Sequence, residues 1–164
     1  MTNSVDMLRR LVQAQVVHFA HLSEQTFEME RDQFTRLAQE LGLSTVPKNL
    51  TSVHVVDCIG RYEPINNTTI AEKLSLSKAS ITKISAKLLE DGYIKRSQLN
   101  DNRKEVFFSL AAKGKRVFEL HEKLHEREKQ RLLQLMGSFS ETELSAILRF
   151  LQTLSDHYGG RAPE

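Results

Sequence analysis

The sequence predicts a mainly α-helical fold on three observations. Apolar residues recur at helical spacing along most of the 164 residues. The chain has only seven Gly and three Pro, too few for a loop-rich or many-turned β protein, and only two short runs are β-prone. With 40% hydrophobic and 27% charged residues the chain can bury a core, and its length suits one compact domain or one domain with a helical extension.

Composition also excludes several classes of protein. The single cysteine, Cys58, excludes an internal disulfide framework and a Cys-rich zinc or iron–sulfur module. No apolar run approaches the ~20 residues of a membrane span, and the start MTNSVDMLRR lacks the apolar segment of a signal peptide. We therefore expect a soluble, cytoplasmic protein with no membrane partner.

The first third of the chain is predicted as helix, loop, helix and turn. Over residues 5–41 the apolar spacing indicates one long helix or two helices with a kink. Residues 42–49, which begin with a glycine and contain a proline, form a connecting loop. Thr51 is placed to cap a helix over residues 52–61, and residues 62–67 are predicted as a turn.

The middle of the chain predicts two further helices. A short helix is expected to begin at Thr68 or Thr69, and Glu72 fits a capping box with Thr69. A longer helix is expected over Ser77–Asp91, with its first residue as the cap and Gly92 directly after its end.

The remaining elements are a hairpin and two helices. Residues 93–110 contain the two β-prone runs, joined by the polar segment LNDNRK, which predicts a β-hairpin with a basic tip. Helical spacing returns over residues 111–136 and again over residues 139–158. The last helix has Ser140 as its expected cap, with Glu143 three residues later.

Charge is concentrated in the middle of the chain. Residues 78–104 contain seven basic and three acidic residues, a net charge of +4, whereas the whole chain has a net charge of +2. A basic segment in a chain that is otherwise slightly acidic is typical of a surface that binds nucleic acid.

The order of helix, tight turn, helix and basic hairpin is that of a winged helix-turn-helix with a β-hairpin wing. The second helix fits a DNA major groove, and the wing tip can reach the adjacent minor groove through Arg103 or Lys104. Lysines on this surface add salt-dependent affinity through counterion release. The candidate contacts to a double-stranded DNA operator are Thr68, Ser77, Lys78, Ser80, Thr82, Lys83, Lys87, Arg96, Arg103 and Lys104.

The segment IAEKLSLSKASITKISAKLLEDGYIKR resembles the recognition region of the MarR transcriptional regulators, and DNRKEVFFSLAAKG is similar to their D-x-R…L-T-x-x-G wing signature. The resemblance implies a homodimer whose first and last helices intertwine. Residues 1–46 and 112–164 would form the helical dimerisation region, and residues 47–111 the winged helix-turn-helix domain. Amphipathic helices at both ends agree with this, because an apolar stripe that no other element covers is buried against a partner.

A candidate metal site comes from the histidines. His121 and His125 are four residues apart on a predicted helix, so both rings project from one face and can share a metal; the spacing equally fits two polar residues on a charged surface. The MarR family includes a zinc-uptake repressor branch, and resemblance to it implies that His54, His121 and His125 bind Zn²⁺ with one carboxylate. The candidates for that carboxylate are Glu24, Glu28, Glu30 and Glu40.

The expected function is a DNA-binding repressor whose affinity is set by Zn²⁺, and alternatives stay open. A small phenolic or lipophilic acid, bound between the winged domain and the dimer helices, is a second candidate effector, and oxidation of Cys58 is a third signal. A hydrolase is excluded, because the sequence has no HExxH, no Ser-His-Asp order and no Gly-rich phosphate loop. A non-enzymatic structural dimer leaves the basic hairpin tip unexplained.

Overall fold

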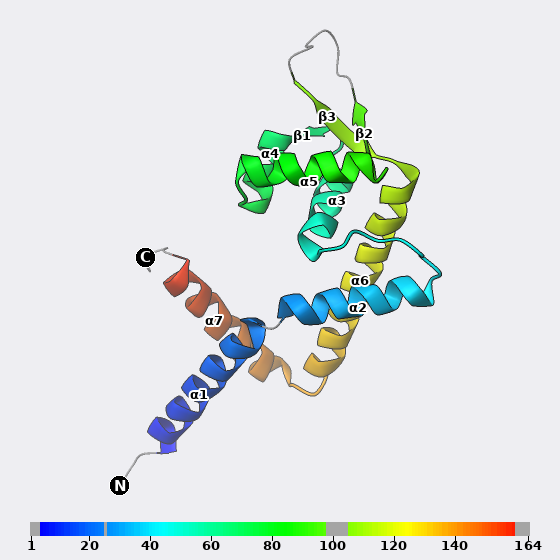
Figure 1. Ribbon diagram of the computed structural model, residues 1–164. Coiled ribbons are helices and arrows are strands. Elements are labelled where there is room, and N and C mark those ends of the chain that lie inside the picture. Colours follow the sequence, from blue (N-terminus) through cyan, green and yellow to red (C-terminus); the bar gives the residue numbers. More distant parts are fainter. Residues whose placement is uncertain (1–3, 25, 98–104, 160–164) are drawn as a thin grey trace. The chain divides into compact units, whose positions relative to one another are not determined.

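The structure is a computed structural model, which describes residues 4–24, 26–97 and 105–159 (Figure 1). It forms two compact units, residues 1–124 and residues 125–164. No helix in the described ranges is long and apolar enough to cross a membrane. In chain order the elements are α1 (Ser4–Glu24), α2 (Thr26–Glu40), α3 (Leu50–Tyr62), β1 (Ile65–Asn66), α4 (Asn67–Leu74), α5 (Lys78–Glu90), β2 (Ile94–Ser97), β3 (Phe107–Leu110), α6 (Ala112–Met136) and α7 (Glu141–Tyr158).

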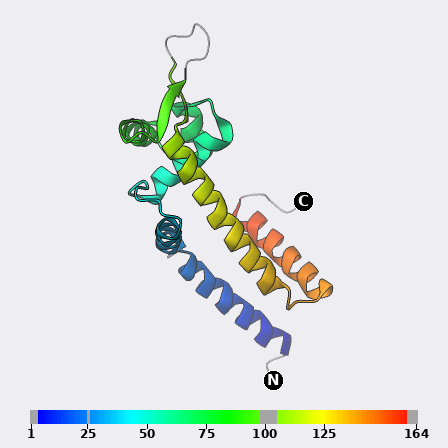
Figure 2. The same ribbon diagram turned by 90° about the vertical axis from the view of Figure 1, so that its right-hand side faces the viewer.

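The predicted hairpin is confirmed, and it belongs to a three-stranded antiparallel sheet in the order β1-β3-β2. In β2 and β3, Ile94 faces Leu110 and Arg96 faces Phe108. Strand β1 lies in the segment predicted as a turn, where Ile65 pairs with Phe108. The sheet lies beside α5, which Figure 2 shows almost end-on.

The core of the first unit is formed by the inward faces of α2 to α6 and the sheet. Ile59, Ile70 and Ile81, one from each of α3, α4 and α5, are fully buried. The first turn of α6 packs closely on the segment before β2, because a Cβ added at Gly114 would lie 2.0 Å from the carbonyl oxygen of Tyr93. Helices α3 to α5 and the sheet, called the winged part below, therefore form one packed body with α2 and the first half of α6.

Two of the expected helix caps are wrong, and in both cases an earlier asparagine takes the role. Asn49, not Thr51, caps α3 by accepting a hydrogen bond from the backbone N–H of Ser52 at 2.8 Å. Asn66 caps α4 by accepting from the N–H of Thr69 at 2.9 Å, so neither Thr68 nor Thr69 is its cap. Each helix consequently begins one or two residues before the predicted start.

The other expected caps are confirmed. Ser77 accepts from the N–H of Ser80 at 3.1 Å and begins α5. Gly92, at φ +76°, follows the end of that helix in the left-handed conformation that glycine adopts without strain. In the second unit, Ser140 and Glu143 form the capping box that begins α7.

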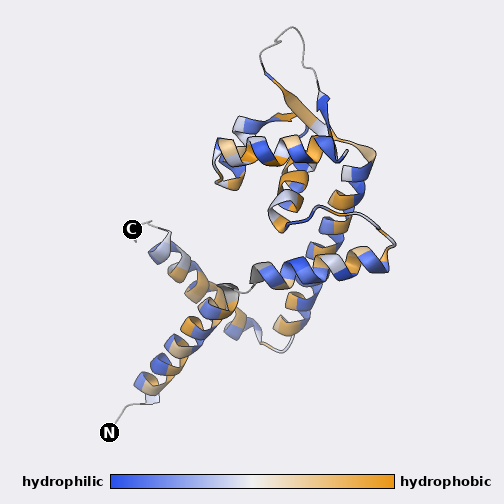
Figure 3. Ribbon diagram, in the orientation of Figure 1, coloured by the Kyte–Doolittle hydropathy of each residue, from blue (hydrophilic) through white to orange (hydrophobic). Residues whose placement is uncertain are grey.

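Two helices carry apolar side chains that stay exposed in the single chain. Over residues 5–41 the helical segment is divided into α1 and α2, and α1 exposes Leu8, Leu11 and Phe19, the last of them by 72%. In α7 no residue is buried, and Leu148 and Leu151 are exposed by 57% and 51%. Figure 3 shows hydrophobic residues recurring along both helices.

Candidate metal centre and nucleic-acid interface

Helix α5 presents one buried and one exposed face. Ile81 and Leu88 pack into the core, and Ser85 is 1% exposed and donates a hydrogen bond to Asn67 Oδ1 at 2.8 Å. This bond joins α5 to the first residue of α4. The candidate DNA contacts on α5 and its cap are all exposed, namely Ser77, Lys78, Ser80, Thr82, Lys83 and Lys87.

The exposed polar groups of α5 differ in their local partners. The hydroxyls of Ser77 and Ser80 are hydrogen-bonded to each other at 2.8 Å, and Thr82 donates to the carbonyl of Lys78. Lys87 forms ion pairs with Glu90 at 3.0 Å and Asp91 at 3.1 Å. Lys83 has no ion-pair partner among the residues that the structure describes, so its ammonium group is available to a phosphate or a base.

The other candidate DNA contacts lie outside α5. Thr68 is exposed in the first turn of α4, and Arg96 is exposed on β2. Arg103 and Lys104, predicted for the wing tip, lie outside the described residues.

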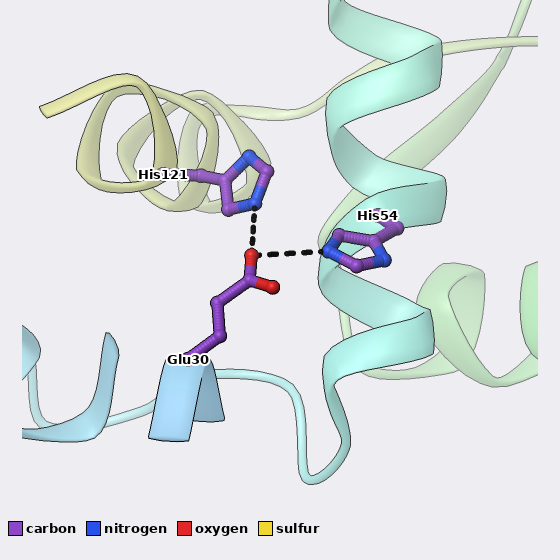
Figure 4. Close-up of side chains that lie close together, drawn as sticks. All are labelled: Glu30, His54 and His121. Atoms are coloured by element: carbon purple, nitrogen blue, oxygen red, sulfur yellow. Dashed lines mark hydrogen bonds and ion pairs between the residues drawn. The ribbon is translucent and has the colours of Figure 1, made fainter. Parts of the chain in front are cut away.

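Three possible metal ligands from three helices converge within the first unit. Glu30 of α2, His54 of α3 and His121 of α6 each offer one donor atom, and these atoms lie within 4.8 Å of one another. Figure 4 shows one carboxylate oxygen of Glu30 facing both rings. That oxygen, Oε1, lies 3.3 Å from Nε2 of His54 and 3.4 Å from Nε2 of His121.

The donor set and two of its distances fit Zn²⁺. Zinc prefers four ligands in a tetrahedron and takes imidazole nitrogen and carboxylate oxygen readily. Ligands at about 2.0–2.1 Å from the metal lie roughly 3.3–3.4 Å from one another at the corners of that tetrahedron. The Glu30–His54 and Glu30–His121 distances have this length, and each is also a long hydrogen bond in the tautomer whose facing ring nitrogen carries the proton.

Of the candidate carboxylates whose side chains the structure describes, Glu30 is the one that lies beside the histidines. Glu28 and Glu40 are exposed on α2, and Glu24 ends α1 with a side chain outside the described part of the structure. His125 is exposed one turn after His121, and the group of donors found within the described residues does not include it.

The second ring nitrogen of His121 has a partner of its own. Nδ1 lies 3.1 Å from Oδ1 of Asp57, which stands on α3 one turn after His54. Arg61 donates to both oxygens of Asp57, at 2.8 and 3.1 Å, and also to Glu122. Burial alone raises the pKa of Asp57, but the hydrogen bonds and charges of His121 and Arg61 outweigh it and lower the pKa from 3.8 to about 2.

Cys58 is a core residue of α3. It is 4% exposed, and burial raises the pKa of its thiol despite the nearby charge of Lys73. A buried thiol held in the protonated form is a poor nucleophile, so this site favours packing over redox sensing.

Sequence reasoning missed one participant and left another undecided. Glu30 was one of four equivalent candidates, because the length of the loop between α2 and α3 does not reveal the register of its helix. Asp57 is not among the candidates that the sequence predicts, since its contact with His121 joins residues 64 positions apart. The one available signal was weak, an acidic residue one helical turn after His54.

Comparison with known proteins identifies relatives over nearly the whole chain. The MarR family model matches residues 48–106, which include α3, α4, α5 and β2. The HTH-type transcriptional regulator PchR of Bacillus subtilis (strain 168) is 46% identical over 150 residues, covering 92% of this chain and 89% of PchR.

Solved structures give the same fold. The structure of Streptococcus pneumoniae FabT in complex with DNA matches with a TM-score of 0.69, and the match spans 92% of this chain and 99% of the FabT chain. The two sequences are 18% identical, so this comparison supports the fold alone. Lactococcus lactis ZitR, described as a zinc-responsive MarR family member, has a TM-score of 0.63 at 30% identity, covering 70% of this chain and 79% of its own. ZitR has also been solved in complex with DNA.

Proposed function

Since the chain belongs to the MarR family of DNA-binding transcriptional regulators, we propose that it is a homodimeric repressor whose affinity for its operator is set by Zn²⁺. Its family and structural neighbours are transcriptional regulators and not enzymes. The observation that carries the zinc proposal is the convergence of Glu30, His54 and His121.

The proposed contact with DNA uses the exposed face of α5. Lys83 is the strongest candidate on this face, because it is exposed and has no ion-pair partner within the described ranges. Lys87 is a weaker one, because a phosphate must compete with Glu90 and Asp91 for its ammonium group. Thr68 and Arg96 extend the surface to α4 and β2, and Arg103 and Lys104 remain proposed contacts of the wing tip.

The proposed role of Zn²⁺ is to join three helices of the first unit. A bound ion would be held by Glu30 on α2, His54 on α3 and His121 on α6, with His125, one turn farther along α6, as the proposed fourth ligand. When bound, the metal supplies a cross-link that holds α2 and α6 against the winged part. Zn²⁺ would raise the affinity for DNA only to the extent that it binds the DNA-binding conformation more tightly than the other conformations of the protein.

The proposed homodimer rests on the exposed apolar faces of α1 and α7. Residues such as Phe19 and Leu148 stay largely exposed in the single chain, and apolar faces of this kind are typically covered in an assembly. With two-fold symmetry, the two copies of α5 would contact half-sites separated by about one helical turn of DNA, roughly 34–36 Å.

A pocket gives some support to the alternative of a small organic acid. It has a volume of about 350 Å³ and lies between α2 and the start of α3. Phe34, Leu50 and Val53 form its apolar wall, and Arg31 and Lys48 offer positive charge to a carboxylate. If this site rather than the metal controls the protein, benzoate will release DNA from the wild type and not from the Arg31→Ala variant.

Titration calorimetry with Zn²⁺ tests the proposed metal function. The wild type is expected to show a tight site, and the His54→Ala and His121→Ala variants are expected to lose it. His157→Ala is the matched control, because this histidine is exposed on α7 and is not part of the cluster. Unchanged affinity in both cluster variants would refute the assignment.

A further inference from the structure

We propose that Asp57 is a positioning residue of the Glu30–His54–His121 cluster: it keeps a proton on Nδ1 of His121 and thereby turns Nε2, with its unshared electron pair, towards the metal position. The expected effect on Zn²⁺ affinity rests on the proposed zinc function. The position of the proton on His121 rests only on the contacts of Asp57 and His121.

The geometry places His121 between two carboxylates with different roles. Oδ1 of Asp57 lies 3.1 Å from Nδ1, and Oε1 of Glu30 lies 3.4 Å from Nε2. The ring is 3% exposed, so water does not compete strongly for either nitrogen. Both carboxylates can accept a hydrogen bond from a ring N–H, and the shorter contact, with Asp57, favours the proton on Nδ1 of the neutral ring.

The two carboxylates are also restrained differently. Asp57 receives two hydrogen bonds from Arg61, from Nε at 2.8 Å and from Nη2 at 3.1 Å, and Arg61 is tied in turn to Glu122 on α6. The Asp57 side chain is 17% exposed, and the two hydrogen bonds from Arg61 hold its carboxylate oxygens in place as acceptors. Glu30 faces His54 and His121 through a single oxygen, which is the arrangement of a shared ligand position.

Close packing of α3 on α6 keeps the Asp57–His121 distance short. A Cβ added at Gly60 would lie 2.5 Å from the ring of Phe118, so the two helices approach each other at this point. The guanidinium carbon of Arg61 lies 5.8 Å from the centre of the same ring. The acceptor is thus positioned by the fold as well as by its hydrogen bonds.

The chemical consequence follows from the two nitrogens of imidazole. A ring nitrogen that binds a metal must be unprotonated, so the proton has to reside on the other nitrogen. A carboxylate that accepts a hydrogen bond from that proton orients the ring and raises its basicity towards the metal. In this chain Asp57 is the residue placed to do so, and Nε2 of His121 is the ligand atom.

The first test observes the proton directly. ¹⁵N–¹H correlation spectra of histidine-labelled, metal-free protein, recorded over a pH series, are expected to show a hydrogen-bonded proton on Nδ1 of His121 in the wild type. In Asp57→Ala this signal should be lost or exchange rapidly with water. Observation of only the Nε2–H form in the wild type would overturn the inference, and this reading does not depend on how the variant folds.

The second test measures the consequence for the metal. Competition with a chromophoric chelator is expected to give about 10- to 100-fold weaker Zn²⁺ binding for Asp57→Ala than for the wild type. Glu119→Ala is the matched control, because it removes the same charge from an exposed position of α6 two residues before His121 and leaves the Asp57–Arg61 and Asp57–His121 contacts in place. The control is expected to change the affinity by less than about twofold.

The two proposals fail in distinguishable ways. If the wild type binds no Zn²⁺ but the Nδ1 proton depends on Asp57, the zinc function is refuted and the positioning of His121 by Asp57 stands. If the wild type binds Zn²⁺ and Asp57→Ala matches it in both affinity and the Nδ1 signal, the positioning role is refuted and the zinc function stands.

Discussion

The helices of the winged part and helices α1 and α7 share an amphipathic pattern but differ in what covers their apolar faces. Ile59 and Ile81 are fully buried by other elements of the same unit, whereas Phe19 on α1 and Leu148 on α7 are 72% and 57% exposed. The difference shows that helices α2 to α6 and the sheet close a core of their own, whereas the apolar faces of α1 and α7 stay exposed in the single chain. In the proposed account a second copy of the chain covers these faces.

The largest expected effect is on assembly. A charge placed in the apolar face of α7, as in Leu151→Glu, would be buried without a partner in the dimer and should weaken dimerisation by roughly 100- to 1,000-fold. Sedimentation velocity over a concentration series measures it, with Gln152→Glu as the control for charge. A wild type that sediments as a monomer at every concentration would contradict the dimer.

The next effect is on the core of the winged part. Ile59→Ala removes three buried carbon atoms from α3, and it is expected to lower the free energy of unfolding by about 2–5 kcal/mol. Urea unfolding measures the loss. Val17→Ala on α1, where the side chain is 48% exposed, is the comparison, and its effect should depend on protein concentration because it acts through the dimer. If Val17→Ala lowered the free energy of unfolding as much as Ile59→Ala at every protein concentration, the contrast between the two regions would be wrong.

Asp57→Asn should lower the stability of the metal-free protein in a pH-dependent manner. Because the pKa of Asp57 is lowered from 3.8 to about 2 on folding, the ionised group contributes about 2 kcal/mol above pH 4. This contribution is lost as the pH falls through the pKa of Asp57 in the folded protein, so the free energies of unfolding of wild type and variant converge towards pH 2. Unfolding at pH 7, 5 and 3 measures the difference.

Asp32→Asn is the control for that pH dependence. Asp32 is an exposed residue whose contact with Arg31 is 3.5 Å long, and its substitution should change stability very little at any of these pH values. A difference between wild type and Asp57→Asn that stays constant down to pH 3 would show that the Asp57 variant acts through packing and not through charge.

The smallest expected effect is on DNA affinity. Lys83→Ala is expected to weaken operator binding by about tenfold and to reduce the dependence on salt, because a lysine bound to phosphate releases counterions. Electrophoretic mobility shifts at several salt concentrations measure both. Lys129→Ala, on the last third of α6, should change neither, and an unaltered salt dependence in Lys83→Ala would remove this lysine from the proposed interface.

The long helices with a regular apolar period could be predicted well from the sequence. A two-residue strand and two of the helix caps could not. Helices α5, α6 and α7 follow from apolar spacing and from caps such as Ser77 and Ser140. The caps of α3 and α4 were wrong because Asn49 and Asn66 lie just before the threonines and compete for the same backbone N–H groups. Strand β1 has two residues, too few for a period, and is defined by its pairing with β3.

The metal site was also predicted only in part, because a local pattern identifies residues within one helix but not contacts between helices. His54 and His121 followed from spacing within their own helices and from the family resemblance. Glu30 required the position of α2 against α3 and α6, and Asp57 required the packing of α3 on α6. Such contacts between elements depend on tertiary packing, which no local pattern in the sequence specifies.

The most direct test of the central claim is fluorescence anisotropy of a labelled duplex from the protein's own upstream region, titrated with protein in Zn²⁺ or in chelator. The account predicts that Zn²⁺ tightens binding by roughly 5- to 150-fold in the wild type and has no effect in His121→Ala. Equal wild-type affinity with Zn²⁺ and with chelator would contradict it.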